Sequence, residues 1–142
     1  DYARRYGVKS IILRIFNPYG KNQNPCFLVP TIIKGLQEEV QLHSPDLTRD
    51  YVHIKDIVDA FIRAIDYGGQ CEIVNIGSGK PYAVKEMVAM VEKISRKTVK
   101  YSFTSQEVPV KGMWADITKA KRLLHWEPKI PLEEGLKDLL AT

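Results

Sequence analysis

Short runs of β-branched residues alternate with segments of helical periodicity along the whole chain. The runs are short enough for buried strands, and the periodic segments carry apolar residues at every third or fourth position. Strands are predicted for residues 8–16, 40–43, 72–76 and 99–103, and helices for residues 26–37, 56–67, 84–95, 119–125 and 132–140. This alternation predicts an α/β fold in which a small mixed sheet of three or four short strands is covered by packed helices.

The predicted helix over residues 56–67 has one apolar stripe that defines its expected buried face. Its first residue, Asp56, is expected to cap the helix, because carboxylates are favoured at helix N-termini. Thr118 is expected to cap the helix over residues 119–125. The inward face of the first helix is predicted to consist of Ile57, Val58, Phe61, Ile62 and Ile65.

Length and composition restrict the classes of protein to which the chain can belong. Its 142 residues are enough for one domain with a core and too few for two. The net charge of +4 comes from scattered basic residues rather than from a basic stripe, so nucleic-acid binding is not expected. No run approaches 18 apolar residues, so no membrane contact is expected. Cys26 and Cys71 form no CxxC pair and fit the reduced thiols of a cytoplasmic protein. The three histidines lack the spacing of metal ligands.

The segment Arg-Ile-Phe-Asn-Pro-Tyr-Gly at residues 14–20 ends the first predicted strand, and residues 17–25 form a loop rich in Asn and Pro. A side chain at the carboxyl end of a strand lies where α/β folds bind their ligands. The amide of Asn17 can donate to phosphate oxygens there, or it can simply close the turn before Pro18. The residue types alone favour the turn.

The segment Arg-Asp-Tyr-Val-His-Ile-Lys-Asp at residues 49–56 begins with a potential phosphate ligand. A guanidinium is a planar fork that binds two phosphate oxygens at once, which lysine cannot do. For a single arginine at the start of a strand, the alternative is a surface ion pair of Arg49 with Asp46 or Asp50. Three other members of the segment are expected to be structural: Asp50, Tyr51 and His53.

Two segments imitate motifs of nucleotide-dependent enzymes. Tyr51 and Lys55 have the Tyr-x-x-x-Lys spacing of a catalytic pair, but that chemistry needs both side chains on one helical face, and this span is extended. Residues 75–80, Asn-Ile-Gly-Ser-Gly-Lys, lie between a strand and a helix as a dinucleotide loop would. The third glycine of that loop is replaced by Tyr82, and a Walker loop would need glycine in place of Val74. Neither a catalytic pair nor a phosphate loop is predicted.

Three further segments occur near the C-terminus: Trp-Ala-Asp-Ile-Thr-Lys-Ala-Lys at residues 114–121, Leu-Leu-His-Trp-Glu-Pro at 123–128 and Leu-Glu-Glu-Gly-Leu at 132–136. Together with segments 14–20 and 49–56, they resemble the second half of the NAD-dependent nucleotide-sugar epimerase/dehydratase family, the extended short-chain dehydrogenases. The resemblance covers essentially the whole chain but only the later, substrate-binding portion of the family. It implies one substrate-binding domain over residues 1–142, the C-terminal part of an extended Rossmann-type fold without its dinucleotide-binding half. Residues 1–25 would be a remnant of the Rossmann edge helix and strand.

The resemblance also implies roles in binding a nucleoside-diphosphate sugar. Asn17 and Arg49 would hold the diphosphate, and this favours the ligand-binding interpretation of Asn17 over the turn. Val40 and Leu42 would lie near the base.

Other implied contacts concern the cofactor and the ribose. Phe16 and Pro18 would border the nicotinamide of the family's cofactor, NAD or NADP. Glu107 stands about where family members carry an Asp and could accept a hydrogen bond from a ribose hydroxyl. Thr104 stands about where the family has a second phosphate-binding Arg, so that contact is expected to be lost.

The family's glycine-rich dinucleotide loop and its catalytic Tyr-x-x-x-Lys pair would precede Asp1. The chain alone is therefore expected to bind a nucleotide sugar, to catalyse no redox reaction and to bind no cofactor by itself. The alternative is a stand-alone structural or protein-interaction module. A strand over residues 8–16 would then offer an unpaired edge, which favours a homodimer or a complex with a missing Rossmann half.

Overall fold

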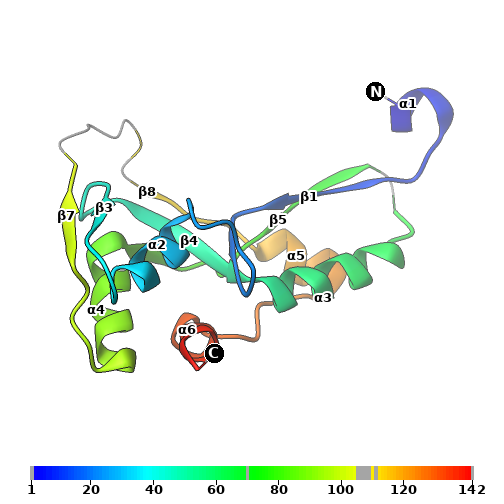
Figure 1. The fold of residues 1–142 in the computed structure, drawn as a ribbon. Helices are drawn as coiled ribbons and strands as arrows, with labels where there is room; N and C mark the ends of the chain where they lie inside the picture. The colour runs from blue at the N-terminus through cyan, green and yellow to red at the C-terminus, as the bar shows by residue number, and fades with distance from the viewer. Residues whose placement is uncertain (1, 70, 105–109, 111, 142) are drawn as a thin grey trace.

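The computed structural model describes residues 2–69, 71–104, 110 and 112–141, and Figure 1 shows them as an elongated α/β molecule. The helices are α1 (Tyr2–Tyr6), α2 (Leu28–Lys34), α3 (Ile54–Ile65), α4 (Val84–Ser95), α5 (Thr118–Leu124) and α6 (Leu132–Leu140). The strands are β1 (Ile11–Ile15), β2 (Asn17–Tyr19), β3 (Val40–Leu42), β4 (Thr48–His53), β5 (Glu72–Ile76), β6 (Pro81–Ala83), β7 (Tyr101–Phe103) and β8 (Gly112–Met113). None of the helices in these ranges is both long and apolar enough to span a bilayer.

The strands form three small sheets rather than the single layer predicted from the sequence. β1 and β5 pair in parallel, and so do β3 and β7 at the other end of the molecule (Figure 1). Between them, β4 pairs in parallel with β2 and β8 and antiparallel with β6. The prediction of a mixed α/β fold is confirmed, but the number of strands was underestimated. The short strands β2, β6 and β8 lie in segments that read as turns or loops, and β4 was treated only as an extended segment.

The central strand β4 separates two hydrophobic cores. Successive side chains of a strand point to opposite faces, so Tyr51 belongs to the core formed with α2, α4 and α6, and Val52 to the core formed with α3, α5 and β5. The second core also contains Trp126, whose indole Nε1–H donates to the backbone oxygen of Asp56 at 3.0 Å. The two cores pack against opposite faces of β4, and this fixes the position of the polar residues on that strand.

Helix α3 buries a different face from the predicted one. Ile57 is buried as expected, but the residue that accompanies it inward is Ala60, which is fully buried. The other four predicted inward residues are at least half exposed: Val58, Phe61, Ile62 and Ile65. These four recur at the spacing of one helical stripe, so α3 has an apolar stripe on its outer face. Periodicity alone could not tell which of the two apolar faces is covered.

The two predicted helix caps are also corrected. Helix α3 begins at Ile54, and its N-cap is His53, whose Nδ1 accepts from the backbone N–H of Lys55 at 3.2 Å. Asp56 lies inside the first turn, and its buried carboxylate accepts from the backbone N–H groups of Lys129 and Ile130, both at 3.1 Å. Asp56 therefore holds the segment that leads to α6 rather than capping its own helix.

The N-terminus of α5 shows the same kind of displacement. Thr118 is the first residue of α5, and the carboxylate of Asp116 accepts its backbone N–H at 2.9 Å. The side-chain acceptor thus lies two residues earlier than predicted.

The first predicted strand, over residues 8–16, corresponds to β1 in the structure, and the open edge expected for it stays a prediction. β1 pairs with β5 over five residues, from Ile11 with Glu72 to Ile15 with Ile76, and β5 is its one partner strand within the part of the chain that the structure describes. The single-domain boundaries and the assignment of residues 1–25 to a Rossmann remnant stay predictions.

Candidate functional site

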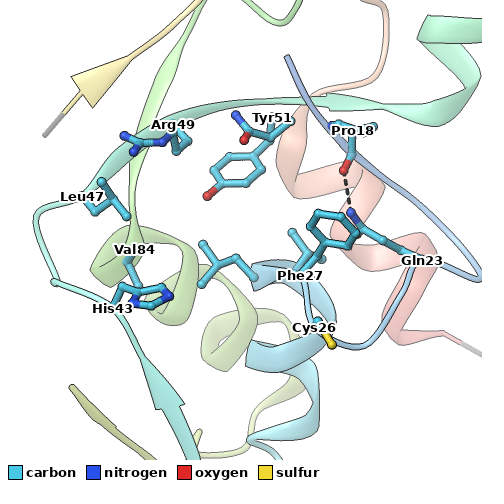
Figure 2. Close-up of a pocket in the computed structure, with 12 residues that line it drawn as sticks. Pro18, Gln23, Cys26, Phe27, His43, Leu47, Arg49, Tyr51 and Val84 are labelled. Carbon is cyan, nitrogen blue, oxygen red and sulfur yellow. Dashed lines mark hydrogen bonds between the residues drawn. The ribbon is translucent and has the colours of Figure 1, made fainter. Parts of the chain in front are cut away.

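A pocket of about 220 Å³ opens between β2, β4 and α2, and it receives both residues that the sequence singled out as phosphate ligands. Figure 2 shows Arg49 and Tyr51 on one side of this pocket, with Gln23, Cys26 and Phe27 on the other. Parallel pairing places Asn17 opposite Tyr51, so the start of β2 and the middle of β4 meet at the pocket. The remaining lining residues are Asn17, Pro18, Leu28, Val29, His43, Leu47 and Val84.

The side chain of Asn17 ties the two strands together. Its amide nitrogen donates to the backbone oxygen of Asp50 on β4 at 2.8 Å. An amide nitrogen carries two N–H donors, so this bond leaves the second N–H for another acceptor. The bond runs across to β4 instead of closing a local turn before Pro18.

The guanidinium of Arg49 contacts two backbone carbonyls. Nη1 donates to the oxygen of Thr48 at 2.8 Å, and both Nη atoms donate to the oxygen of Val110 at 3.2 Å. Asp50 turns its carboxylate toward other partners, and the carboxylate of Asp46 is bound by the ammonium of Lys85 at 2.7 Å. The described contacts of Arg49 thus fix its position through neutral groups and leave its positive charge to act on the pocket.

Asp50 occupies the turn that imitates a dinucleotide loop. Its fully buried carboxylate accepts from the backbone N–H of Ser78 at 2.6 Å, of Gly79 at 2.9 Å and of Ala115 at 3.0 Å. The hydroxyl of Ser78 donates to the same carboxylate at 2.6 Å. A Cβ at Gly77 would lie 2.6 Å from this carboxylate, and Gly79 has a φ of +73°, so both glycines are needed for the carboxylate to enter the turn.

These contacts decide how far the described residues fit the cofactor of the family. A dinucleotide phosphate needs unpaired backbone N–H groups at such a turn, but here the N–H groups of Ser78 and Gly79 are bound to Asp50. The turn therefore does not fit NAD or NADP phosphates. Of the residues predicted to border a nicotinamide, Pro18 lines the pocket, and Phe16 links β1 to β2 and donates its N–H to Ile76 at 2.9 Å.

Tyr51 and Lys55, which have the spacing of a catalytic Tyr-x-x-x-Lys pair, lie on two different elements. Tyr51 lies on β4 in the first core, and burial raises its pKa to about 12. Lys55 lies on α3 and its ammonium is 3.6 Å from the carboxylate of Asp138. A catalytic tyrosine needs a lowered pKa to act as a base near neutral pH, so these two residues are not arranged as a catalytic pair.

The predicted base-binding residues on β3 face inward. Val40 and Leu42 are buried in the first core, and the N–H of Val40 and the oxygen of Leu42 bond to the segment that contains β7. Their side chains therefore pack in the core, and their contact with a base stays a prediction. Glu107 lies outside the described residues. No group of three or more His, Cys, Asp or Glu side chains is placed to hold a metal ion in the part of the chain that the structure describes.

Several pocket residues were missed in the sequence: Gln23, Cys26, Phe27 and His43. Gln23 and Cys26 belong to the segment between β2 and α2, and Gln23 donates from Nε2 to the oxygen of Pro18 at 2.7 Å. The available signal was position, because this segment follows the carboxyl end of a strand, where α/β folds bind ligands.

Comparison with known proteins agrees with this architecture. The sequence model of the GDP-mannose 4,6 dehydratase family matches residues 1–139. A UDP-glucuronate 4-epimerase of Thermodesulfobacterium geofontis is 35% identical over 141 residues, which are 96% of this chain and 43% of the relative.

Solved structures with similar folds include a UDP-glucose 4-epimerase of Thermotoga maritima with UDP-glucose. It is 33% identical, with a TM-score of 0.83, over 99% of this chain and 47% of that one. The UDP-glucuronic acid 4-epimerase of Bacillus cereus, in complex with UDP-glucuronic acid and NAD, is 29% identical, with a TM-score of 0.87, over 99% of this chain and 48% of that one.

The chain spans 43–48% of the length of the curated relatives that it matches. The match falls on their C-terminal part, and the structural relatives have the extended Rossmann-type fold, as the sequence motifs predicted. The chain belongs to the GDP-mannose 4,6 dehydratase family, among the NAD-dependent nucleotide-sugar epimerases and dehydratases.

Proposed function

We propose that this chain binds a nucleoside-diphosphate sugar and forms the substrate-binding half of an NAD- or NADP-dependent epimerase or dehydratase. The observation that carries the proposal is the meeting of Arg49 and Asn17 at one pocket, although they lie on different strands. The positively charged guanidinium of Arg49 is held by hydrogen bonds to backbone carbonyl groups. The side-chain amide of Asn17 uses one N–H in its bond to Asp50, which leaves the second N–H for a ligand. A diphosphate offers acceptors to both groups, and charge-assisted hydrogen bonds to a guanidinium are the stronger ones.

The size of the pocket fits a partial site. Pockets that enclose small ligands typically measure about 300–1,000 Å³, whereas this one measures about 220 Å³. It can hold a diphosphate with part of the sugar, and the rest of the ligand would lie outside it. The nucleotide proposed is UDP, because the UDP-glucuronate 4-epimerase of Thermodesulfobacterium geofontis and the UDP-glucose 4-epimerase of Thermotoga maritima, to which this chain is similar, are named for UDP-sugars.

We assign no redox step to this chain alone. The turn of residues 77–79 is filled by the carboxylate of Asp50, and Tyr51 and Lys55 lie apart with the pKa of Tyr51 raised. Hydride transfer would need cofactor-binding and base groups in addition to these described residues. The contribution of this chain would be to bind and orient the diphosphate.

Replacing Arg49 by alanine is expected to weaken binding of UDP-glucose at least about tenfold, since one charged hydrogen-bond partner contributes about 1.5–3 kcal/mol. Arg49→Lys should bind UDP-glucose with an affinity between those of the unmodified chain and Arg49→Ala, because lysine keeps the positive charge but lacks the planar guanidinium. Isothermal titration calorimetry with UDP-glucose, UDP-glucuronic acid and UDP measures both effects. Arg14→Ala is the matched control, because Arg14 lies on β1, bonds to Asn75 and does not line the pocket.

Equal affinities for Arg49→Ala and the unmodified chain would contradict the placing of the diphosphate. An absence of binding to every UDP compound would contradict the proposed function itself. If the chain binds none of them and sediments as a dimer, a second candidate function is favoured instead.

That second candidate is binding to a second copy of this chain through the outer face of α3. The apolar stripe over Val58, Phe61, Ile62 and Ile65 is exposed, and contiguous apolar surface of this kind marks interaction sites. β1 also pairs with β5 alone within the described residues. Both features favour association, and neither involves the pocket.

A further inference from the structure

We infer that Gln23 is a specificity-determining residue of the pocket, whose side-chain oxygen accepts a hydrogen bond from a hydroxyl of the bound sugar. The inference rests on the proposed function and adds a contact that recognises the sugar rather than the diphosphate. It starts from a polar atom for which the described residues supply no hydrogen-bond donor. Oε1 of Gln23 is shielded from solvent and receives no hydrogen bond from the described residues. A ligand hydroxyl can therefore reach it only when a neighbouring side chain moves aside.

The orientation of the Gln23 amide is fixed by its neighbour. Nε2 donates to the backbone oxygen of Pro18 at 2.7 Å, as the dashed line in Figure 2 shows. That oxygen is an acceptor, so turning the amide over would place two acceptors against each other. Nε2 must therefore face Pro18, and Oε1 must face away from it.

A buried acceptor without a donor is unusual in a folded protein and calls for a specific reason. Asn17 and Arg49, which line the same pocket, offer N–H donors, and Gln23 adds an oxygen that can only accept. A site that binds only a diphosphate would use donors alone, because phosphate oxygens are acceptors. An acceptor in the same pocket suits a ligand that carries both phosphate and hydroxyl groups.

The bond to Pro18 places Gln23 next to the middle of β2, and by the family resemblance the sugar is the part of the ligand expected there. Pro18 is one of the residues predicted to border the nicotinamide, and the reacting sugar must lie beside that ring. The hydroxyl donor is therefore assigned to the sugar ring and not to the ribose or the base. Phe27, which lines the same pocket and is 56% exposed, is the neighbouring side chain with room to move when the sugar enters.

The test compares Gln23→Leu with the unmodified chain by calorimetry, using UDP-glucose and UDP. Gln23→Leu is expected to weaken the binding of UDP-glucose about three- to tenfold, which is the effect of losing one neutral hydrogen bond. The affinity for UDP should stay unchanged. The melting temperature without ligand should not fall, because the variant removes a buried acceptor together with the bond to Pro18. Gln37→Leu is the matched control, since Gln37 is exposed and lies outside the pocket.

The outcomes separate this inference from the function on which it rests. Binding of UDP that depends on Arg49, with equal UDP-glucose affinities for Gln23→Leu and the unmodified chain, would overturn the role of Gln23 alone. If Gln23→Leu bound UDP and UDP-glucose with equally reduced affinity, the role of Gln23 would also be overturned, because the acceptor would then contact the nucleotide or stabilise the loop. If Gln23→Leu does not fold, the side-chain amide of Gln23 can be followed by nitrogen-15 NMR in the unmodified chain. Its signals are expected to shift with UDP-glucose and not with UDP, and the lack of such a difference would refute the assignment.

Discussion

Replacing Asp50 by alanine is expected to reduce the free energy of unfolding by at least about 4 kcal/mol, because several buried hydrogen-bond donors lose their acceptor at once. The carboxylate is fully buried and accepts the backbone N–H groups of Ser78, Gly79 and Ala115. These donors belong to two segments that are far apart in the sequence, and this side chain adds to the attachment that β6 and β8 give them by pairing with β4. Domains of this size have a total stability of about 5–15 kcal/mol, so the variant should be close to unfolding at room temperature.

Urea denaturation followed by far-ultraviolet circular dichroism measures the loss. Asp66→Ala is the control, because Asp66 is an exposed aspartate at the C-terminal end of α3 and should change the stability little. Asp50→Asn keeps one acceptor oxygen and should lie between the two. A midpoint for Asp50→Ala close to that of the unmodified chain would show that the turn of residues 77–79 does not depend on this carboxylate.

Replacing Trp126 by alanine is expected to cost about 3–5 kcal/mol, the usual effect of removing a large aromatic side chain from a core. Trp126 is 1% exposed, packs between α3, α5 and β5, and donates its indole N–H to the backbone of Asp56. Asp56 in turn holds the segment that leads to α6. The loss should therefore include weaker attachment of the C-terminal segment as well as a cavity.

The chain supplies its own control for this prediction. Trp114→Ala removes the same side chain from a position that is 54% exposed, and it should change the unfolding free energy by less than about 1 kcal/mol. The same urea titration serves both variants. Equal losses for the two tryptophans would contradict the assignment of Trp126 to the second core.

Elements with one apolar face and clear ends could be predicted from the sequence. The predicted bounds of α4, α6 and β5 coincide with the observed ones, because each has a single buried face and a turn on either side. The bounds of α2 and β7 were less accurate, since their ends are set by tertiary contacts. β6 and β8 were not predicted, because strands of two or three residues have no periodicity of their own and exist through pairing with β4.

Helix α3 shows a different limit of sequence reasoning. Its hidden face carries Asp56 and Ala60, and its exposed face carries Phe61 and Ile62. Hydrophobicity favours the second face, so the prediction was wrong for a physical reason. Burial of Asp56 depends on the N–H groups of Lys129 and Ile130, which come from a segment far along the chain.

Site residues that belong to a recognisable motif could be predicted from the sequence, and site residues positioned by a loop could not. Asn17 and Arg49 stand out in the segments 14–20 and 49–56, and parallel pairing of β2 with β4 brings those segments together. Gln23 has no motif, and its interest comes from the bond to Pro18, which depends on the path of the loop. The ligand-binding roles of these residues stay proposals.

The most direct test of the central claim, that a nucleotide sugar binds in this pocket, is the rate at which Cys26 is alkylated. Cys26 is an exposed thiol that lines the pocket, and Cys71 is an exposed thiol just before β5, outside the pocket, which serves as an internal control. With UDP-glucose at ten times its dissociation constant, alkylation of Cys26 should slow roughly tenfold, because only the free fraction reacts. Peptide mass spectrometry should find the rate at Cys71 unchanged, and Arg49→Ala should remove the protection. Equal rates at Cys26 with and without UDP-glucose, at concentrations where calorimetry detects binding, would show that the ligand lies elsewhere.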